Sequence, residues 1–447
     1  MFMIFSVDAR YHGAGPIKYA WDPRGNYVAS SGASRVAHIC SRRGKLVDQI
    51  VLPSPSMCTL LEWSKNANIL AIVQANSSSV VLWEPKRIQQ HQVVDLPCKD
   101  ITFIQWSKSP RSLLLAIGTS RGQVYIYDHA KGTKTQVASK HKRRILCGDW
   151  SLEDKFAFGS EDNQITICLP SGQTCDQVKI KASPQSVTFG GKKKSILSVN
   201  MGGKTILLYD LNERENALEL AFQSRYGNIV SYQWFGNGYI IAGFSSGYVV
   251  VISTHINEIG QEQYCAKFHD TSLREIVFNE ANGIVATCGD NCIKVVRMSD
   301  WKEIAVEYLD GNSTAFSTAA SASGPAGSLS FSSPSDAFGS NSTTGAVHAT
   351  SVSLSYETLQ WTPHGQILSV SSRNGCLYNF MIHKTVLRTS MFKFDAPLAA
   401  VLKPIAPLTM LLTLAFMVCT FLLVISIQFQ VSCLDVIRAM TGFVEGL

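Results

Sequence analysis

Short apolar runs separated by small and polar turn residues recur along the chain from its start to about residue 310. A typical unit has runs at residues 60–63, 69–73 and 80–83, each rich in β-branched or aromatic side chains. Gly, Asn, Asp and Ser bound these runs, which is typical of short strands joined by tight turns. Helical periodicity is absent from the whole region, so the pattern predicts an all-β domain.

One aromatic residue ends the first run of each unit and marks the phase of the repeat. These markers are Trp21, Trp63, Trp106, Trp150, Phe189, Trp234, Phe278 and Trp361. Successive markers lie 42, 43, 44, 39, 45, 44 and finally 83 residues apart. A period near 40–45 residues with several short strands is typical of WD40 repeats, in which four strands form each blade of a propeller. The Trp-Asp signature is degraded, surviving in forms such as Tyr127-Asp128.

The long last interval contains a segment of different composition, residues 312–355. It consists almost entirely of Ser, Ala, Gly and Thr, and Asp336 is its one Asp, Glu, Lys or Arg residue. Such a composition cannot bury enough apolar area to offset the entropy of ordering. We therefore predict a disordered insertion here.

Seven units precede this insertion and one follows it. We predict that residues 1–311 form a seven-bladed WD40 β-propeller, with Ile4–Val7 supplying the missing outer strand of the last blade. The unit at residues 356–383 is then an orphan WD-like blade, the first of a truncated second propeller. An eight-bladed ring is the alternative.

The tail carries an uncharged run, residues 404–434, with a twenty-residue apolar core at 408–427. Twenty helical residues span the roughly 30 Å hydrocarbon core of a bilayer. This predicts a C-terminal hydrophobic, transmembrane-like helix, with the propeller on the cytosolic side. The other interpretation is an alternative transcript end or a gene-model artefact, which would make the chain a truncated form. The apolar residues taken to represent the membrane segment are Leu408, Leu411, Phe416, Phe421 and Ile427.

Charge and cysteine usage narrow the class of protein. The net charge of +7 comes from 40 basic and 33 acidic side chains scattered along the chain, without the concentrated basic face of a nucleic-acid binder. The 12 cysteines include no CxxC pair, so we expect no zinc site and a reducing, cytosolic setting. The positive mean hydropathy of +0.08 owes much to the charge-poor insertion and tail.

Two basic runs stand out, at residues 140–144 and 192–194. The plain interpretation is a solvated loop in each case. The more specific interpretation, for the first run, is a contact for acidic lipid headgroups or an acidic partner. The cations that would make that contact are Lys140, Lys142, Arg143 and Arg144.

Three features imitate active sites but lack the necessary context. The string Gly243–Gly247 matches a nucleophile elbow, but the strand-like residues 248–252 follow it where that motif needs a helix. The string at residues 203–205 is similarly followed by a strand rather than by a phosphate-binding helix. His141, His255 and His269 stand isolated, and we expect them in loops. We therefore predict no enzyme, no cofactor and no metal site.

Specific stretches carry a resemblance to a known family. These are residues 227–238, 243–255, 258–262 and 285–294. In them the chain resembles the WD repeat-containing protein 19 family, core subunits of intraflagellar transport complex A. The resemblance covers about 5–53, 56–310 and 356–381. In that family a second propeller, a long α-solenoid and a cysteine-rich end follow, whereas this chain has the insertion and the apolar tail.

The resemblance implies a non-enzymatic scaffold acting in retrograde ciliary transport, in cilium assembly and in the ciliary entry of membrane receptors. The implied partners are other complex A subunits and receptor cargo held through adaptors, with membrane contact and without nucleic acid. The implied location is the cilium, the basal body and the cytoplasm. The alternative from a different class is a tail-anchored propeller that faces the cytosol and serves as an adaptor in vesicle or organelle traffic.

Overall fold

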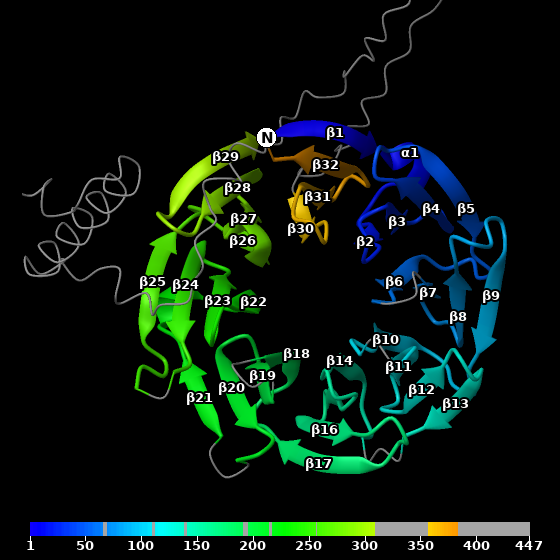
Figure 1. Cartoon of the computed structure of the whole chain (residues 1–447), viewed down its shortest axis with the longest axis horizontal. Helices are drawn as coiled ribbons and strands as arrows, with labels where there is room; N and C mark the ends of the chain where they lie inside the picture. Colours follow the sequence, from blue (N-terminus) through cyan, green and yellow to red (C-terminus); the bar gives the residue numbers. More distant parts are fainter. Residues whose placement is uncertain are drawn as a thin grey trace, which may run out of the picture. The chain divides into compact units, whose positions relative to one another are not determined.

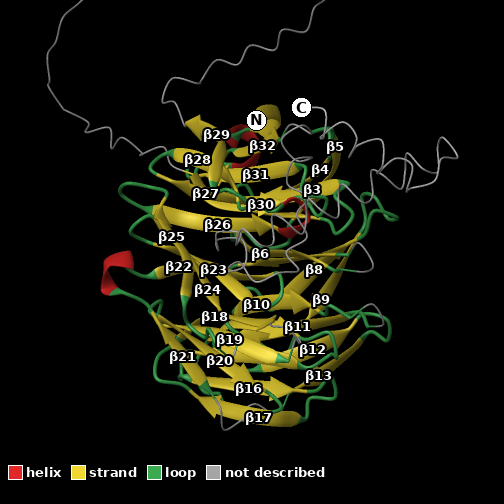
Figure 2. Ribbon diagram, turned by 60° about the vertical axis from the view of Figure 1, so that its left-hand side comes forward, coloured by secondary structure: helices red, strands yellow, loops and turns green. Residues whose placement is uncertain are grey.

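The computed structural model describes residues 1–65, 69–109, 112–137, 141–190, 195–213, 217–255, 257–308 and 356–382. Within this part the chain forms eight four-stranded antiparallel sheets. The sheets are arranged as blades around a central axis, with the first strand of each blade innermost (Figure 1). Strands make up nearly all of the ordered structure, and helices are confined to three short segments (Figure 2).

Seven blades are continuous in sequence. Blades 1 to 4 are β2 (Lys18–Trp21), β3 (Tyr27–Ser31), β4 (Val36–Ser41), β5 (Leu46–Val51); β6 (Cys58–Trp63), β7 (Leu70–Gln74), β8 (Ser79–Trp83), β9 (His91–Asp95); β10 (Ile101–Trp106), β11 (Leu114–Thr119), β12 (Val124–Asp128), β13 (Thr133–Gln136); and β14 (Ile145–Trp150), β15 (Phe156–Ser160), β16 (Gln164–Cys168), β17 (Thr174–Lys179).

Blades 5 to 7 are β18 (Pro184–Gly190), β19 (Ile196–Met201), β20 (Thr205–Asp210), β21 (Leu218–Ala221); β22 (Ile229–Phe235), β23 (Tyr239–Phe244), β24 (Tyr248–Ser253), β25 (Glu262–Lys267); and β26 (Leu273–Asn279), β27 (Ile284–Gly289), β28 (Cys292–Arg297), β29 (Lys302–Tyr308). The short helices are α1 (Ala9–His12), η1 (Ser224–Tyr226) and η2 (Glu280–Asn282).

The eighth blade joins the two ends of the described chain. Its inner three strands are β30 (Tyr356–Trp361), β31 (Ile367–Ser372) and β32 (Leu377–Met381), and its outer strand is β1 (Phe2–Val7). The antiparallel β1–β32 register runs from Phe2 opposite Met381 to Val7 opposite Leu377, with a bulge near its start. Ile4–Val7 does form an outer strand that closes the ring, as predicted, but it belongs to blade 8 and not to blade 7, whose outer strand is its own β29.

The prediction of seven blades was wrong, because the unit after the insertion closes this ring and does not begin a second propeller. One core cluster packs β30–β32 against blade 7 through Ile284, Ala286 and Val295. Another packs the other side of blade 8, including Ile367, against blade 1. The 83-residue interval was misinterpreted as the end of a ring, although an insertion between two blades lengthens a connection without changing the number of blades.

The middle strands of the blades explain why the repeat can be recognised in the sequence although its Trp-Asp signature is degraded. Every residue of β7, β11, β15 and β23 is buried. Neighbouring blades cover both faces of these strands, so they are continuous apolar runs rather than alternating ones. The outer strands face water, and all four residues of β13 are exposed.

Several of the aromatic phase markers tie a blade to its neighbour through the indole N–H. The Trp63 indole N–H donates to the carbonyl of Ala20 in blade 1 at 2.9 Å. The Trp150 indole N–H makes the same bond to Gln105 in blade 3 at 3.0 Å. These bonds satisfy buried polar groups across the blade interfaces, so the repeat spacing reflects a repeated physical contact.

The predicted tail, including Leu408, Leu411, Phe416, Phe421 and Ile427, lies outside the described residues, as does the insertion at 312–355. Among the residues that the structure describes, no helix is long and apolar enough to cross a membrane.

Two glycines provide a matched test of ring closure. Gly44 and Gly132 both have positive φ, +81° and +67°, so alanine should cost each about 1 kcal/mol of backbone strain. A Cβ on Gly44 would lie 2.6 Å from the Cγ atom of Phe5 in the closing strand, whereas a Cβ on Gly132 would meet nothing within 4 Å. We expect Gly44→Ala to lower the free energy of unfolding by at least about 1 kcal/mol more than Gly132→Ala. Equal losses in urea denaturation would contradict the importance of this contact.

Candidate functional site

The basic loop, defined as residues 141–144, connects blade 3 to the inner strand β14 of blade 4. Lys142, Arg143 and Arg144 are exposed, while His141 is buried. Lys140 lies outside the described residues. Three of the four cations predicted for an acidic contact are thus placed on one short surface segment.

The His141 ring anchors this loop to blade 4. Its Nδ1 lies 2.9 Å from the nearer carboxylate oxygen of Asp162, and its Nε2 lies 2.7 Å from the hydroxyl of Thr166. A carboxylate accepts hydrogen bonds, so Nδ1–H donates to Asp162 and the Thr166 hydroxyl donates to Nε2. The ring also packs edge-on against Phe158, with centroids 5.2 Å apart.

Backbone contacts fix the loop further. The Ser160 hydroxyl donates to the Arg143 carbonyl and the Glu161 amide donates to the Arg144 carbonyl, both at 3.0 Å. Gly122 packs so closely that a Cβ there would lie 2.6 Å from the His141 carbonyl oxygen. The backbone of the loop is therefore held from both sides, while its cationic side chains point to solvent.

The charge of the basic loop is largely uncompensated. Within the part of the chain that the structure describes, Lys142, Arg143 and Arg144 make no ion pair. The Asp162 carboxylate is already held by His141, and the exposed Glu161 offsets part of the positive charge. A pinned loop with free cations can bind carboxylates or phosphates at little cost in backbone entropy.

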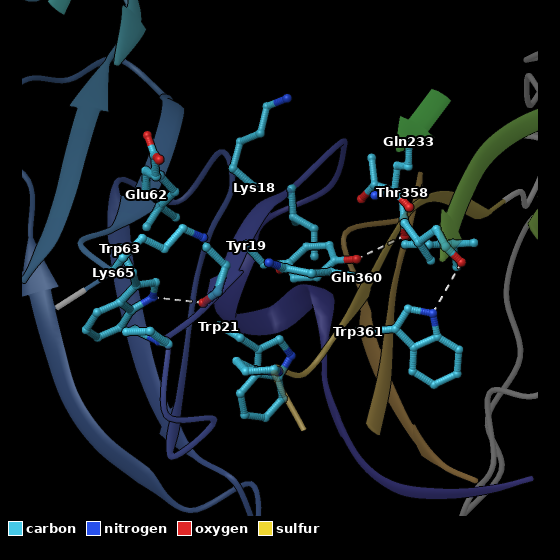
Figure 3. Close-up of a pocket in the computed structure, with 17 residues that line it drawn as sticks. Lys18, Tyr19, Trp21, Glu62, Trp63, Lys65, Gln233, Thr358, Gln360 and Trp361 are labelled. Atoms are coloured by element: carbon cyan, nitrogen blue, oxygen red, sulfur yellow. Dashed lines mark hydrogen bonds between the residues drawn. The ribbon is translucent and has the colours of Figure 1, made fainter. Parts of the chain in front are cut away.

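A second feature is a cavity of about 710 Å³ along the inner strands β2, β6 and β30 (Figure 3). Its wall is held together across blades, because the Tyr19 hydroxyl donates to the carbonyls of Ser369 at 2.9 Å and Thr358 at 3.1 Å. Desolvation raises the pKa of Glu62 in this wall to about 8, opposed by the charge of Lys65. The described lining residues include polar and apolar side chains but no histidine or cysteine.

The strings that imitate active sites lie in hairpins. Gly243 ends the pairing of β23 with β24, and a three-residue connection, residues 245–247, joins these strands in a hairpin, as the sequence predicts. The string at 203–205 likewise leads directly into β20. Burial also raises the pKa of the Cys147 and Cys168 thiols to about 12, which leaves them unreactive. Among the described residues, no group of three His, Cys, Asp or Glu side chains could hold a metal ion.

The buried histidines have a structural role in the fold that the sequence analysis did not predict. His141 and His269 lie in loops as predicted, but each is buried and paired with an aspartate 21 residues later, Asp162 and Asp290. His269 Nε2 also lies 2.9 Å from the Thr287 hydroxyl. The recurring spacing of 21 residues was the signal available in the sequence.

The ring of four-stranded blades, its degraded Trp-Asp repeat and the buried histidines with their aspartate and threonine neighbours define a WD40 β-propeller. The model of a family described as the WDR19 first beta-propeller matches residues 17–325. The chain belongs to this family, as its sequence resemblance predicts.

Relatives with curated names agree with this assignment. The chain is 33% identical over 397 residues to WD repeat-containing protein 19 of Homo sapiens, covering 87% of this chain and 26% of that protein. It is 30% identical over 293 residues to WD repeat-containing protein dyf-2 of Caenorhabditis elegans, covering 64% and 21%. The chain thus spans about a quarter of the length of the relatives it matches.

Solved structures support the fold alone. The C-terminal WD40 domain of Sif2 superposes with a TM-score of 0.62 at 14% identity, covering 86% of this chain and 98% of that one. Sqt1 from Chaetomium thermophilum superposes with a TM-score of 0.63 at 13% identity, covering 85% and 99%.

The anchor of the basic loop can be tested by removing one hydroxyl. Thr166→Val leaves His141 Nε2 without this donor, so we expect a loss of about 1–2 kcal/mol in the free energy of unfolding and faster amide exchange at Arg143. Thr135→Val, on the exposed outer strand β13, is the matched control and should change neither quantity. Unchanged exchange at Arg143 in Thr166→Val would show that the histidine does not hold the loop.

Burial of His269 predicts a dependence of stability on pH. Desolvation lowers its pKa to about 4, although Asp290 opposes this shift. The unfolded chain takes up a proton near pH 6.5 and the folded chain does not, so stability falls as pH drops from about 6.5 toward 4. Urea denaturation at several pH values measures how the free energy of unfolding changes with pH. His269→Gln should make this dependence shallower by roughly 1 kcal/mol per pH unit. His91→Gln, at an exposed site, should leave it unchanged. Identical slopes for His269→Gln and the unsubstituted chain would refute the assignment.

Proposed function

We propose that this chain is a non-enzymatic interaction scaffold of intraflagellar transport complex A, acting in retrograde ciliary transport, cilium assembly and the entry of membrane receptors into cilia. Membership of the WDR19 first beta-propeller family is the observation that carries the proposal. The proposed location is the cilium, the basal body and the cytoplasm. The proposed partners are other complex A subunits and receptor cargo held through adaptors.

The architecture supports a scaffold role. A closed ring of eight blades presents many loops on a rigid frame, and such frames serve recognition through their loops. The cavity lined by β2, β6 and β30 offers a concave surface with both polar and apolar side chains. Binding therefore accounts for the described sites without any reaction.

Within this role the basic loop docks an acidic segment of a partner protein. The support is geometric: Lys142, Arg143 and Arg144 are exposed and without ion pairs among the described residues, while their backbone is pinned through His141. Arginine forms paired hydrogen bonds with carboxylates, which favours Arg143 and Arg144 as the principal contacts. Acidic lipid headgroups are the competing ligand and would appear as a separate outcome of the test.

Charge reversal in ciliated cells tests this function. A tagged chain should form basal-body and axonemal puncta and should co-purify with complex A subunits. Arg143→Glu/Arg144→Glu should reduce that recovery about tenfold, because two charge-assisted contacts become repulsive. Lys134→Glu/Lys302→Glu, an equal charge change on two outer strands, is the control and should behave as the unsubstituted chain.

Three outcomes would count against the proposal. A reticular membrane pattern of the unsubstituted chain would contradict the ciliary role. Full recovery of subunits by Arg143→Glu/Arg144→Glu would show that the basic loop is not a protein dock. If Arg143→Glu/Arg144→Glu lost binding to acidic vesicles but still recovered the subunits, the basic loop would be assigned to lipid headgroups.

A further inference from the structure

A second positively charged surface lies on blades 1 and 2. It is formed by three turns, between β2 and β3, between β4 and β5, and between β8 and β9. We name it the cationic sector, and its cations, all exposed, are Arg24, Arg43, Lys45, Lys86 and Arg87.

The cationic sector lies on the face of the ring opposite the basic loop. In an antiparallel four-stranded blade, the turns after the first and third strands share one end of the sheet. Connections between blades, including the basic loop, lie at the other end. The two positive surfaces therefore cannot contact one flat object together.

Buried bonds hold the three turns together as one surface. The Asp48 carboxylate in β5 accepts the Trp83 indole N–H at 2.7 Å and the Gln89 amide N–H at 2.8 Å, which ties the β8–β9 turn to blade 1. The Arg42 amide donates to the Asn26 carbonyl at 2.8 Å, which ties the β4–β5 turn to the β2–β3 turn. The cations are thus displayed from a fixed backbone.

Nearby acids do not neutralise the sector. In the described part of the chain, none of its five cations makes an ion pair. Asp48 is buried and occupied, as described above. Asp22 is buried and accepts the amide of Asn26, and Glu84 lies 3.4 Å from His129. Uncompensated like charges gathered on one surface favour an anionic ligand.

Two aliphatic side chains distinguish the kind of anion. Leu46 is 42% exposed beside Lys45, and Ile88 is 51% exposed beside Arg87. An acidic peptide would pair with the cations and gain little from these side chains. A bilayer surface offers phosphates and carboxylates to the cations and an apolar boundary to the aliphatic tips.

We propose that the cationic sector is a peripheral binding surface for an anionic phospholipid bilayer. Arg43, Lys45, Lys86 and Arg87 contact the headgroups, and Leu46 and Ile88 enter the boundary between headgroups and acyl chains. Contact on this face leaves the basic loop pointing away from the bilayer, free for a protein partner. This inference goes beyond the proposed scaffold role and stands independently of it.

Vesicle flotation of the full chain tests the proposal. The probe is a phosphatidylcholine vesicle with roughly 30% phosphatidylserine, compared with pure phosphatidylcholine. We expect stronger binding to the anionic vesicle, weakened by salt, and a loss of about tenfold or more in Lys86→Glu/Arg87→Glu. The control is Lys134→Glu/Lys302→Glu, with an equal charge change on the outer strands β13 and β29, which should bind as the unsubstituted chain. Residues 404–434 are identical in all variants, so differences between variants report the sector.

A second variant separates a bilayer from an acidic peptide. Ile88→Ser keeps every charge, and we expect it to weaken anionic-vesicle binding several-fold while leaving polyglutamate binding unchanged. Full vesicle binding by Lys86→Glu/Arg87→Glu would overturn the proposal. A second pair of results would also overturn it: Lys86→Glu/Arg87→Glu loses polyglutamate binding, and Ile88→Ser leaves vesicle binding unchanged. Together these results would assign the sector to an acidic protein segment. Both outcomes are distinguishable from failure of the scaffold role, whose test uses the other face and subunit recovery.

Discussion

The pairing of β1 with β32 is the interaction on which the rest of the ring depends. It brings together residues 2–7 and 377–381 and completes the outer edge of blade 8. Blade 8 then packs on blade 7 through one core cluster and on blade 1 through another. Without this closure, two blade faces made of buried apolar strands would meet water, a cost that no surface contact of the chain could offset.

Closure also determines what the loops can do. Each blade is held on both sides, so the connections between blades have fixed ends and need few bonds of their own to be rigid. In the basic loop, His141 and the backbone contacts of Arg143 and Arg144 are enough. In the cationic sector, Asp48 performs the same role from a neighbouring blade. Both surfaces therefore combine a buried side chain that fixes the backbone, His141 in one and Asp48 in the other, with exposed cations that carry no structural duty.

The strands and the family could be predicted from the sequence because they rest on local pattern. Apolar runs, turn residues and the aromatic marker recur with each blade, and marker indoles such as those of Trp63 and Trp150 bond across blade interfaces. The number of blades could not be predicted in this way, because closure pairs residues separated by nearly the whole described chain. The cationic sector could not be predicted from the sequence either, since Arg43 and Lys86 belong to turns of different blades. The bond to Asp48 of blade 1 ties the turn that carries Lys86 to blade 1. The basic loop was visible because its cations are consecutive.

The β1–β32 pairing has a consequence for the order in which the protein is made. Phe2 leaves the ribosome long before its partner Met381, which is synthesised about 380 residues later. Until then the N-terminal strand has no edge to join, while blades 1 to 7 accumulate as an open stack with apolar faces at both ends. The newborn chain therefore has its greatest exposure to aggregation just before the strands of blade 8 are made. Because the charge-poor residues 312–355 are translated within that interval, they lengthen the wait before the ring can close.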